Sequence, residues 1–479
     1  MSAIAAPKPK RRRRAIPWLV ALLIIVLIIG GAGFWLARAA SAAINAVGAL
    51  TVYRPAAFVA HDDCNYQPAV TGAIVVPGDS IRTDALGRAS ITLPDGTLTR
   101  LAGSTEITLT SAHFAKDGNL QDANFFQKVG RTFVNVQHLI SGATFKVQGQ
   151  AATASVRGTK FEVLITGKGC VPTPSPSPGG KPPLADGSML VKLFEGELDL
   201  DGKNHVHLTA GQQATADPQG NVGDAGPIQP DPDDPFGAEN EASDASNQGT
   251  TPGTEQVFVG NPIHNGETQT YSYSFAGGGI IKAALAWPGS QLQLKVKAPD
   301  RQTYTGDGDS PIVVVVNNAP AGIYTILVIG VSGLGAAGET PYLSVSALEQ
   351  CVSADIDQNG AVRRGLTSED LGKNIDVSGL SNLDLTIFGN SLAGAIVTGS
   401  GTYNGVSWTG TVVVFRHGGL LQIIAVQATV FGVAIPPEQT ISQIGSVIGQ
   451  DPNNINLGFQ VDRLFTCNGV ILIDGRTVG

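Results

Sequence analysis

The segment from 75 to 109 reads VVPGDSIRTDALGRASITLPDGTLTRLAGSTEITL. It places turn-forming groups (Pro-Gly-Asp, Leu-Gly-Arg and Pro-Asp-Gly) between short apolar runs, a pattern typical of β-hairpins. Asp95 and Gly96 can supply the positive φ angles that a tight hairpin needs. The segment contains no cluster of nucleophile, base and acid, no metal-ligand spacing and no phosphate-binding loop. It therefore predicts a β scaffold without catalytic chemistry.

The composition of the whole chain favours the same architecture. The 479 residues include 60 Gly and 28 Pro, while only 15% are charged and 6% are aromatic. Such a chain builds many short strands and few long solvent-exposed helices. We expect a mainly β protein with about three domains. One helix is expected near 436–449, because two prolines open the stretch and isoleucines recur along one face.

The N-terminal region carries the signals of a membrane anchor. Six Lys and Arg residues between Lys8 and Arg14 precede an uncharged apolar run from 16 to 37. That run is long enough to cross a hydrocarbon core of about 30 Å. Because positive clusters stay on the cytoplasmic side, we expect a cytoplasmic tail at 1–15, a single transmembrane helix and an extracytoplasmic remainder at the cell membrane. The alternative is a cleaved signal peptide.

The charge of the exported part limits the partners. Six of the 31 Lys and Arg residues lie in the tail, and all 39 Asp and Glu residues follow it, so the exported part has a net charge of about −14. Proteins that bind nucleic acids present positive charge to the phosphates, so we expect no nucleic-acid partner. The expected partners are membrane lipid, through the single helix, and an envelope ligand or protein. No cofactor is expected.

Low-complexity stretches divide the exported part into blocks. An acidic, Pro/Gly/Ser-rich stretch with few large apolar residues is expected to be a disordered linker at 218–256. A shorter Pro/Ser-rich loop at 171–183 interrupts the strand patterns that precede and follow it. The expected β blocks are therefore 47–217, 257–348 and 349–479, the last with the single helix.

The first block resembles the FecR-type extracytoplasmic domain. The resemblance lies in PGDSIRTDALGRASITLPDGT (77–97), VGRTFVNV (129–136) and ATASVRGTKFEV (152–163), followed by FEGELDLDG and HLTAGQQAT. It implies that the residues of these signatures shape the scaffold, with ligand contact by the arginine of VRGT as the alternative. The signature residues are Gly78, Asp79, Asp95, Gly96, Arg157, Gly158 and Thr159.

Two functions are consistent with this resemblance. The first is a membrane-anchored, non-catalytic binding or scaffold protein that displays β modules to an envelope ligand. The alternative is a transmembrane regulator of an extracytoplasmic-function sigma factor, which is the role of the best-known members of the family. The predicted cytoplasmic tail is short and consists mostly of Lys, Arg, Pro and Ala. For that reason a sigma factor is not the expected partner.

The second block resembles a bacterial pre-peptidase C-terminal-type β-sandwich. The resemblance lies in GETQTYSYSF (266–275) and AALAWPGSQLQLKVKAPD (283–300). It implies a binding or spacer module. Tyr271, Tyr273 and Trp287 are candidate ligand residues, and core or edge packing is the alternative.

The third block resembles LmeA-like lipid-binding proteins in VFGVAIPPEQTISQIG (430–445) and LGFQVDRLFTCNGVILIDGRTV (457–478). An ordinary β-sheet core under one helix is the alternative. The same block contains DIDQNGAV, in which Asp355, Asp357 and Asn359 hold the first, third and fifth positions of a calcium loop. Because Leu366 occupies the position of the closing carboxylate, a polar turn is the other interpretation. No GxSxG motif is present, and we expect no enzyme.

The cysteines form the last expectation. None of them lies in a CxxC pair, so zinc is not expected, and an exported location permits disulfides. Four cysteines allow three pairings. We predict Cys64–Cys170 and Cys351–Cys467, because each pair lies within one block and closes a long loop.

Overall fold

The structure is a computed structural model of the chain, which divides into two units, Met1–Ala43 and Ile44–Gly479. The residues that it describes are 44–45, 48–61, 64–71, 73–93, 95–114, 120–136, 139, 142–156, 158–170, 184–229, 231, 237–251, 254–287, 291–351, 355–373, 378–391, 394–417 and 419–477.

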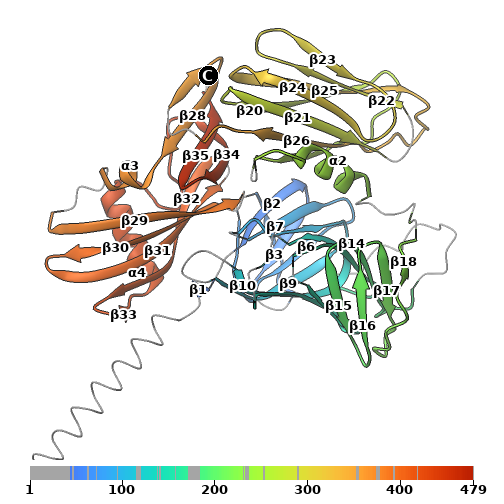
Figure 1. Ribbon diagram of the computed structural model, residues 1–479, viewed down its shortest axis with the longest axis horizontal. Helices are drawn as coiled ribbons and strands as arrows, with labels where there is room; N and C mark the ends of the chain where they lie inside the picture. The colour runs from blue at the N-terminus through green and yellow to red at the C-terminus, as the bar shows by residue number, and fades with distance from the viewer. Residues whose placement is uncertain are drawn as a thin grey trace, which may run out of the picture. The chain divides into compact units, whose positions relative to one another are not determined.

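The transmembrane helix expected at 16–37 lies outside the described residues. Within the described residues, no helix combines the length and the apolar character needed to span a bilayer. The described part of the chain is mainly β, as the composition predicts, and its strands group into three modules (Figure 1).

The first module is a closed barrel that contains β1 to β18. Its strands are β1 (Ile44–Asn45), β2 (Gly48–Arg54), β3 (Ala57–Ala60), β4 (Gln67–Ala69), β5 (Ile74–Val75), β6 (Ser80–Thr83), β7 (Arg88–Thr92), β8 (Leu98–Leu101), β9 (Glu106–Phe114), β10 (Leu120–Asn135), β11 (Thr144–Gln148), β12 (Thr153–Val156), β13 (Lys160–Ile165), β14 (Met189–Glu195), β15 (Glu197–Asp201), β16 (His205–Thr209), β17 (Gln212–Ala216) and β18 (Gly226–Pro227).

Strand β10 joins the two halves of this barrel. Its first half pairs with β9 and β11, and its second half pairs with β8 and β13. Gly130 lies between the two halves with a φ of +94°, and a Cβ there would lie 2.4 Å from the Cα of Thr105. A glycine is therefore required where the strand turns from one half to the other.

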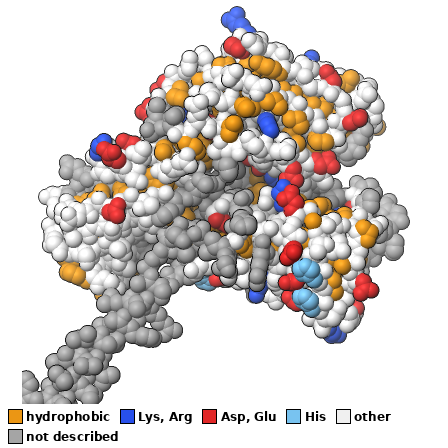
Figure 2. All heavy atoms as spheres, in the orientation of Figure 1, with side chains coloured by type: hydrophobic (Ala, Val, Ile, Leu, Met, Phe, Trp, Pro, Cys, Tyr) orange, Lys and Arg blue, Asp and Glu red, His pale blue; other side chains and the backbone are white. Residues whose placement is uncertain are grey.

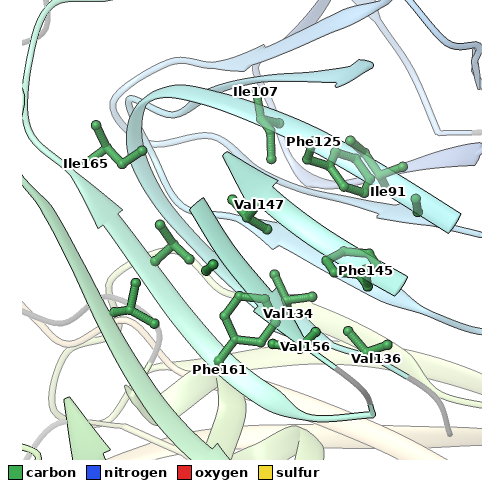
Figure 3. Packing of buried hydrophobic residues seen from close by; sticks show 14 of the residues in the cluster. Ile91, Ile107, Phe125, Val134, Val136, Phe145, Val147, Val156, Phe161 and Ile165 are labelled. Carbon is green, nitrogen blue, oxygen red and sulfur yellow. The ribbon is translucent and has the colours of Figure 1, made fainter. Parts of the chain in front are cut away.

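Alternating side chains fill the interior of the barrel. In β11, for example, Phe145 and Val147 are buried while the residues between and after them are exposed. Figure 3 shows Phe125, Phe145 and Phe161 converging on the same core, and the centroids of the first two rings are 5.6 Å apart. The apolar/polar period of two in the sequence therefore defines this core.

The stretch at 218–256, which we expected to be disordered, differs from that expectation. Its described residues include β18 and helix α2 (Gly237–Asn247). The buried residues of α2 are small or polar, and they include Ala242, Ser243 and Ser246. A composition argument counts large apolar side chains, whereas this segment is held by hydrogen bonds and ion pairs.

The second module consists of two four-stranded sheets that share one core. One sheet has the order β19-β26-β21-β24, and the other has the order β20-β25-β22-β23. The strands are β19 (Gln256–Val259), β20 (Thr268–Phe275), β21 (Gly279–Ala286), β22 (Gln291–Lys297), β23 (Thr303–Gly306), β24 (Ile312–Ala319), β25 (Gly322–Ser332) and β26 (Tyr342–Leu348). The architecture is a β-sandwich, while the resemblance of this block to a particular family stays a prediction.

The third module has a four-stranded sheet, β27-β28-β35-β34, and a five-stranded sheet that runs in order from β29 to β33. Its elements are β27 (Ile356–Gln358), β28 (Ala361–Leu366), α3 (Ser368–Lys373), β29 (Leu380–Ser391), β30 (Gly394–Tyr403), β31 (Val406–His417), β32 (Leu420–Val430), β33 (Val433–Ala434), α4 (Pro437–Ile448), β34 (Gln460–Cys467) and β35 (Val470–Arg476). The helix expected at 436–449 is α4.

Helix α3 was not expected from the sequence. It follows Thr367, whose hydroxyl accepts a hydrogen bond from the backbone N–H of Asp370 at 3.1 Å. The carboxylate of Asp370 in turn accepts one from the backbone N–H of Thr367 at 3.0 Å. This reciprocal pair is a capping box, which satisfies N–H groups at the start of a helix and compensates for the short apolar face.

Candidate functional site

Both predicted disulfides are present. Cys64 pairs with Cys170 and Cys351 pairs with Cys467, with Cα atoms 5.6 and 5.5 Å apart. Cys170 also lies beside Glu106. The backbone N–H of Cys170 donates a hydrogen bond to the carboxylate of Glu106 at 2.7 Å. The first bridge closes a loop inside the first module and the second closes one around the third module.

The signature residues of the first block have structural positions in the barrel. Asp79 is 2% exposed, and its carboxylate accepts hydrogen bonds from the backbone N–H of Val76 at 2.8 Å and from His61 at 2.6 Å. Asp95 accepts from the backbone N–H of Thr97 at 3.0 Å. Each of these carboxylates therefore ties its own turn together.

The glycines of the signatures occupy turns. Gly78, Gly96 and Gly158 have φ values of +105°, +91° and +78°, which L side chains rarely adopt. Thr159 is buried next to the last of them. Arg157 lies outside the described residues, so the choice between a structural and a ligand-binding role for it stays open.

The three candidate ligand residues of the second block are not grouped on an open surface. Tyr273 is 0% exposed and Trp287 is 3% exposed, and both belong to the core of the second module. Tyr271 is partly buried against Phe258, with ring centroids 5.1 Å apart. The packing interpretation therefore describes these residues, and no carbohydrate-type platform is formed by them.

The candidate calcium residues lie on a hairpin. Asp357 is on β27 and forms an ion pair with Arg364 at 3.0 Å. Asn359 lies in the β27–β28 turn and donates its side-chain amide to the carbonyl of Ala321 at 2.9 Å. Asp355 lies 3.8 Å from the same Arg364. These contacts direct the three side chains to protein partners.

Two histidines lie on one exposed face of the β15–β16 hairpin. His205 contacts Asp201 at 2.7 Å, and His207 contacts Asp199 at 2.8 Å. Figure 2 shows histidine side chains beside acidic ones on this part of the surface. Across the described residues, no group of three or more His, Cys, Asp or Glu side chains is arranged to hold a metal ion.

The hydroxyl of Tyr273 leads to a buried ionic cluster that joins the second and third modules. We call this cluster the C-terminal junction. It consists of Tyr273 on β20, Glu349 after β26, Arg363 on β28, Arg463 on β34 and Asp474 on β35. All five side chains are at most 2% exposed.

The contacts in the C-terminal junction are short and reciprocal. Arg363 contacts Asp474 through two nitrogens at 2.6 and 2.8 Å and Glu349 at 2.9 Å. Arg463 contacts Glu349 at 2.9 Å and also hydrogen-bonds Asp474. The Tyr273 hydroxyl accepts from Arg463 at 2.6 Å and donates to the carbonyl of Thr254 at 3.1 Å. Two guanidinium groups and two carboxylates therefore neutralise one another away from water.

The electrostatics of the C-terminal junction follow from this pairing. Burial alone would raise the pKa of Asp474, but Arg463 and Arg363 together hold the pKa below its usual value of 3.8. Burial would lower the pKa of Arg463, but Tyr273, Asp474 and Glu349 raise it instead. The charged forms of Asp474 and Arg463 are thus the stable ones in the folded chain.

A second buried cluster, the α2 junction, joins the first module to helix α2 and the second module. We define it by Arg88, Arg100, Glu239, Asn240, Ser243 and Glu255. Arg100 is 2% exposed and contacts Asn240 at 3.1 Å and Glu255 at 3.1 Å, and it also hydrogen-bonds Ser243. Glu255 accepts a further hydrogen bond from Ser344 of β26 at 2.8 Å.

Glu239 is the least compensated group of the α2 junction. Its side chain is 1% exposed, and neither carboxylate oxygen has a hydrogen-bond partner among the described residues. Its ion pair with Arg88 spans 3.7 Å. Burial raises the pKa of Glu239 despite the opposing effect of Arg100 and Arg88.

A third ionic contact fixes the chain just before α2. Asp231 contacts Arg131 at 2.8 Å, and Glu162 contacts the same guanidinium at 2.8 Å. Lys192 lies 3.2 Å from Glu162 and 3.9 Å from Asp231. The segment after the barrel is therefore attached to the barrel through an acid that belongs to the expected linker.

Sequence reasoning did not find these junctions, although a signal was present. Arg100, Arg363 and Arg463 each interrupt an apolar strand in the sequences LTRL, AVRRGL and QVDRLFTC. A cation at an inward position of a strand requires a buried partner. Some of the partners, such as Glu255 for Arg100 and Tyr273 for Arg463, come from other modules, and the local sequence does not identify them.

One comparison with known proteins concerns the first module. Residues 79–173 match the family model described as FecR protein. The chain therefore contains a FecR domain, and this domain lies within the barrel and contributes Arg100 to the α2 junction. No curated protein matches the chain.

Two solved structures are similar to part of the chain, and each is titled a crystal structure of a putative anti-sigma factor from Parabacteroides distasonis ATCC 8503. The first, at 2.50 Å, is 18% identical and aligns 31% of this chain with 60% of its own, with a TM-score of 0.23. The second, at 1.65 Å, is 20% identical and aligns 38% with 69%, with a TM-score of 0.24. The chain thus spans less than two thirds of the length of the first.

Proposed function

We propose that the chain is a FecR-type signal-transducing protein. Its modules would receive an envelope signal on the extracytoplasmic side, and the segment that precedes Ile44 would pass the signal to a regulator of the sigma-factor class. The observation that carries this proposal is the FecR match at 79–173. This role was the alternative in the sequence analysis, and the match favours it over a passive scaffold.

The ionic junctions support a route by which a signal could reach the FecR domain. Arg100 and Arg131 both lie inside the matched residues. They contact Glu255 and Asp231, which lie beyond the barrel. A ligand that changed the second module would therefore act on groups that are hydrogen-bonded directly to the FecR domain.

Transcript sequencing tests the proposal. The gene is deleted in its host and then restored as the whole chain, as a chain without residues 1–15, or as Arg100→Met. Deletion should change a discrete set of transcripts that share a promoter sequence. The whole chain should restore them and the chain without its basic tail should not. The Arg100→Met chain should restore a basal level that no longer responds to envelope stress.

The scaffold remains the second candidate, because the C-terminal junction is buried and its two arginines pair with its two carboxylates, as a fixed attachment between modules requires. The same experiment separates the two functions. An unchanged transcriptome, with a change only in envelope composition or permeability, would contradict the signalling proposal and favour the scaffold.

A further inference from the structure

Four hairpins of the third module turn through two residues that both have positive φ, which is the mark of a type I′ turn. Each turn lies between paired residues of adjacent strands. The turns, with their φ values, are Asn359-Gly360 (51°, 79°), Asn404-Gly405 (50°, 79°), Asn468-Gly469 (49°, 75°) and Phe431-Gly432 (52°, 75°). Three of them use Asn-Gly, the sequence that this turn favours, and the fourth begins with phenylalanine.

Phe431 has an unfavourable backbone conformation for its residue type. Asparagine tolerates the left-handed region because its short side chain bonds locally, whereas a bulky aromatic residue is strained there. Phe431 does not recover that cost by packing, because it is 68% exposed. A strained and exposed aromatic residue indicates selection for something outside the fold.

Phe431 has apolar neighbours at the same end of the five-stranded sheet. Val433 is 66% exposed and Tyr403 is 47% exposed. The β30–β31 and β32–β33 turns lie side by side, since the backbone N–H of Phe431 donates to the carbonyl of Ser407 at 3.0 Å. Figure 2 shows hydrophobic side chains at this end of the sheet. We call Tyr403, Phe431 and Val433 the tip patch.

The strands that carry the tip patch have no charged residues. Residues 385–415 and 418–437 contain no Asp, Glu, Lys, Arg or His. Protein interfaces surround their apolar centre with a polar and often charged rim. A bilayer instead penalises every charge that is drawn into it. The absence of charge over these two stretches fits a lipid surface better than a protein. Arg416 and His417 lie at the end of β31 that is farther from the tip patch.

Several polar groups near the tip are already paired within the chain. The backbone N–H of Asn404 donates to Gly379, and that of Ile435 donates to Ala428, both at 2.8 Å. The hydroxyls of Thr409 and Thr429 are 2.8 Å apart and those of Ser381 and Thr402 are 2.7 Å apart. Such groups enter a poorly hydrated environment at low cost because they lose no partner.

We infer that the tip patch inserts into the interfacial region of a lipid bilayer, as a second membrane contact that does not depend on the predicted anchor at 16–37. Aromatic side chains favour this interfacial depth. Because no cation lies within residues 385–415 or 418–437, the attraction is apolar, and neither anionic lipid nor salt concentration changes it. The inference is independent of the proposed signalling function.

Vesicle flotation with residues 44–479 provides the test, since this part is a compact unit with its own buried cores. The probe is a vesicle of phosphatidylcholine alone, and the variants are Phe431→Asn and Val433→Thr. The matched control is Val331→Thr, which changes an exposed valine of the second module. Phe431→Asn restores the preferred Asn-Gly turn and should lower vesicle partitioning about 10-fold or more, as loss of a buried aromatic group does.

Val433→Thr should lower partitioning by a smaller factor, and Val331→Thr should leave it unchanged. The thermal midpoint of Phe431→Asn should equal or exceed that of the parent, so the lost binding cannot be ascribed to unfolding. Adding phosphatidylserine or 0.5 M salt should change partitioning less than about twofold. The inference is overturned if the parent does not float, if Phe431→Asn floats as well as the parent, or if binding requires anionic lipid.

Discussion

The two buried junctions differ in how completely their buried charges are paired and hydrogen-bonded. In the C-terminal junction, two arginines face two carboxylates, and a tyrosine hydroxyl completes the set. In the α2 junction, Arg100 pairs with Glu255, but Glu239 is buried 3.7 Å from Arg88, and neither of its carboxylate oxygens has a hydrogen-bond partner in the described part of the chain. Buried charge is stable only when paired and hydrogen-bonded. The C-terminal junction is therefore a fixed attachment, whereas the α2 junction contains one group whose protonation state can change.

Replacing Arg463 with Met should have the largest effect. The variant leaves Glu349 and Asp474 with one guanidinium between them in a buried site, and removing one partner of a buried pair costs about 3–5 kcal/mol. We expect the thermal midpoint to fall by several degrees. Hydrogen exchange should accelerate first in β34 and β35. Exchange that accelerated only in the first module would show that the cluster does not hold the third module.

Replacing Arg100 with Met should cost less, about 2–3 kcal/mol. Its main partner, Glu255, stays 10% exposed and keeps hydroxyl donors from Ser243 and Ser344. The expected signature is local, with faster hydrogen exchange and faster proteolysis in α2. If hydrogen exchange and proteolysis of α2 were as slow in the variant as in the parent, the α2 junction would not be what holds α2 in place.

Replacing Glu239 with Gln should stabilise the chain at pH 7. A carboxyl whose folded pKa is raised above its ordinary value of 4.5 binds protons more readily in the folded state. The parent therefore loses stability as pH rises through that window, and a difference of one between the folded and unfolded pKa corresponds to about 1.4 kcal/mol. Relative to the parent, the free energy of unfolding of the variant should be larger by on the order of 1 kcal/mol at pH 7. At a pH well below the ordinary pKa, the two chains should be equally stable. Thermal midpoints of the two chains across this pH range measure the gain.

Asp474 should respond to pH in the opposite direction. Its folded pKa lies below 3.8, so its stabilising effect is present above that pH and is lost as pH falls through the folded value. Thermal midpoints and module-resolved hydrogen exchange between pH 3 and 8 measure both trends. Acidification should loosen the third module before the attachment of α2, and the reverse order would contradict the comparison.

Replacing Arg364 with Met should have the smallest effect and serves as the control for Arg463. Arg364 is 31% exposed and pairs with Asp357, which is 61% exposed. Solvent screens such pairs, which typically contribute less than about 1 kcal/mol. A loss of stability as large as that of Arg463→Met would mean that burial is not what distinguishes the two arginines.

The sequence predicted the features that depend on local pattern. Strand alternation in β11, the Asp95-Gly96 turn and the helix after Pro436 all follow from spacings of two to four residues. The disulfide pairing could also be predicted from the sequence, because each cysteine was expected to pair within its own domain. The junctions were not, because Arg100 meets Glu255 and Arg463 meets Glu349 across more than a hundred residues, and no local spacing records such a contact. Helix α2, which lies within 218–256, was missed for the same reason.

The bridge between Cys64 and Cys170 has a consequence for proteolytic cleavage of the chain. The two cysteines are 106 positions apart and enclose nearly all of the residues that match the FecR family. A protease that cut one peptide bond inside this loop would leave both products joined by the sulfur bridge, and nothing would be shed. A cut between Cys170 and Cys351 would leave the later modules attached to the FecR domain only through noncovalent contacts such as the α2 junction, whereas a cut between Cys351 and Cys467 would again leave both products joined by a bridge.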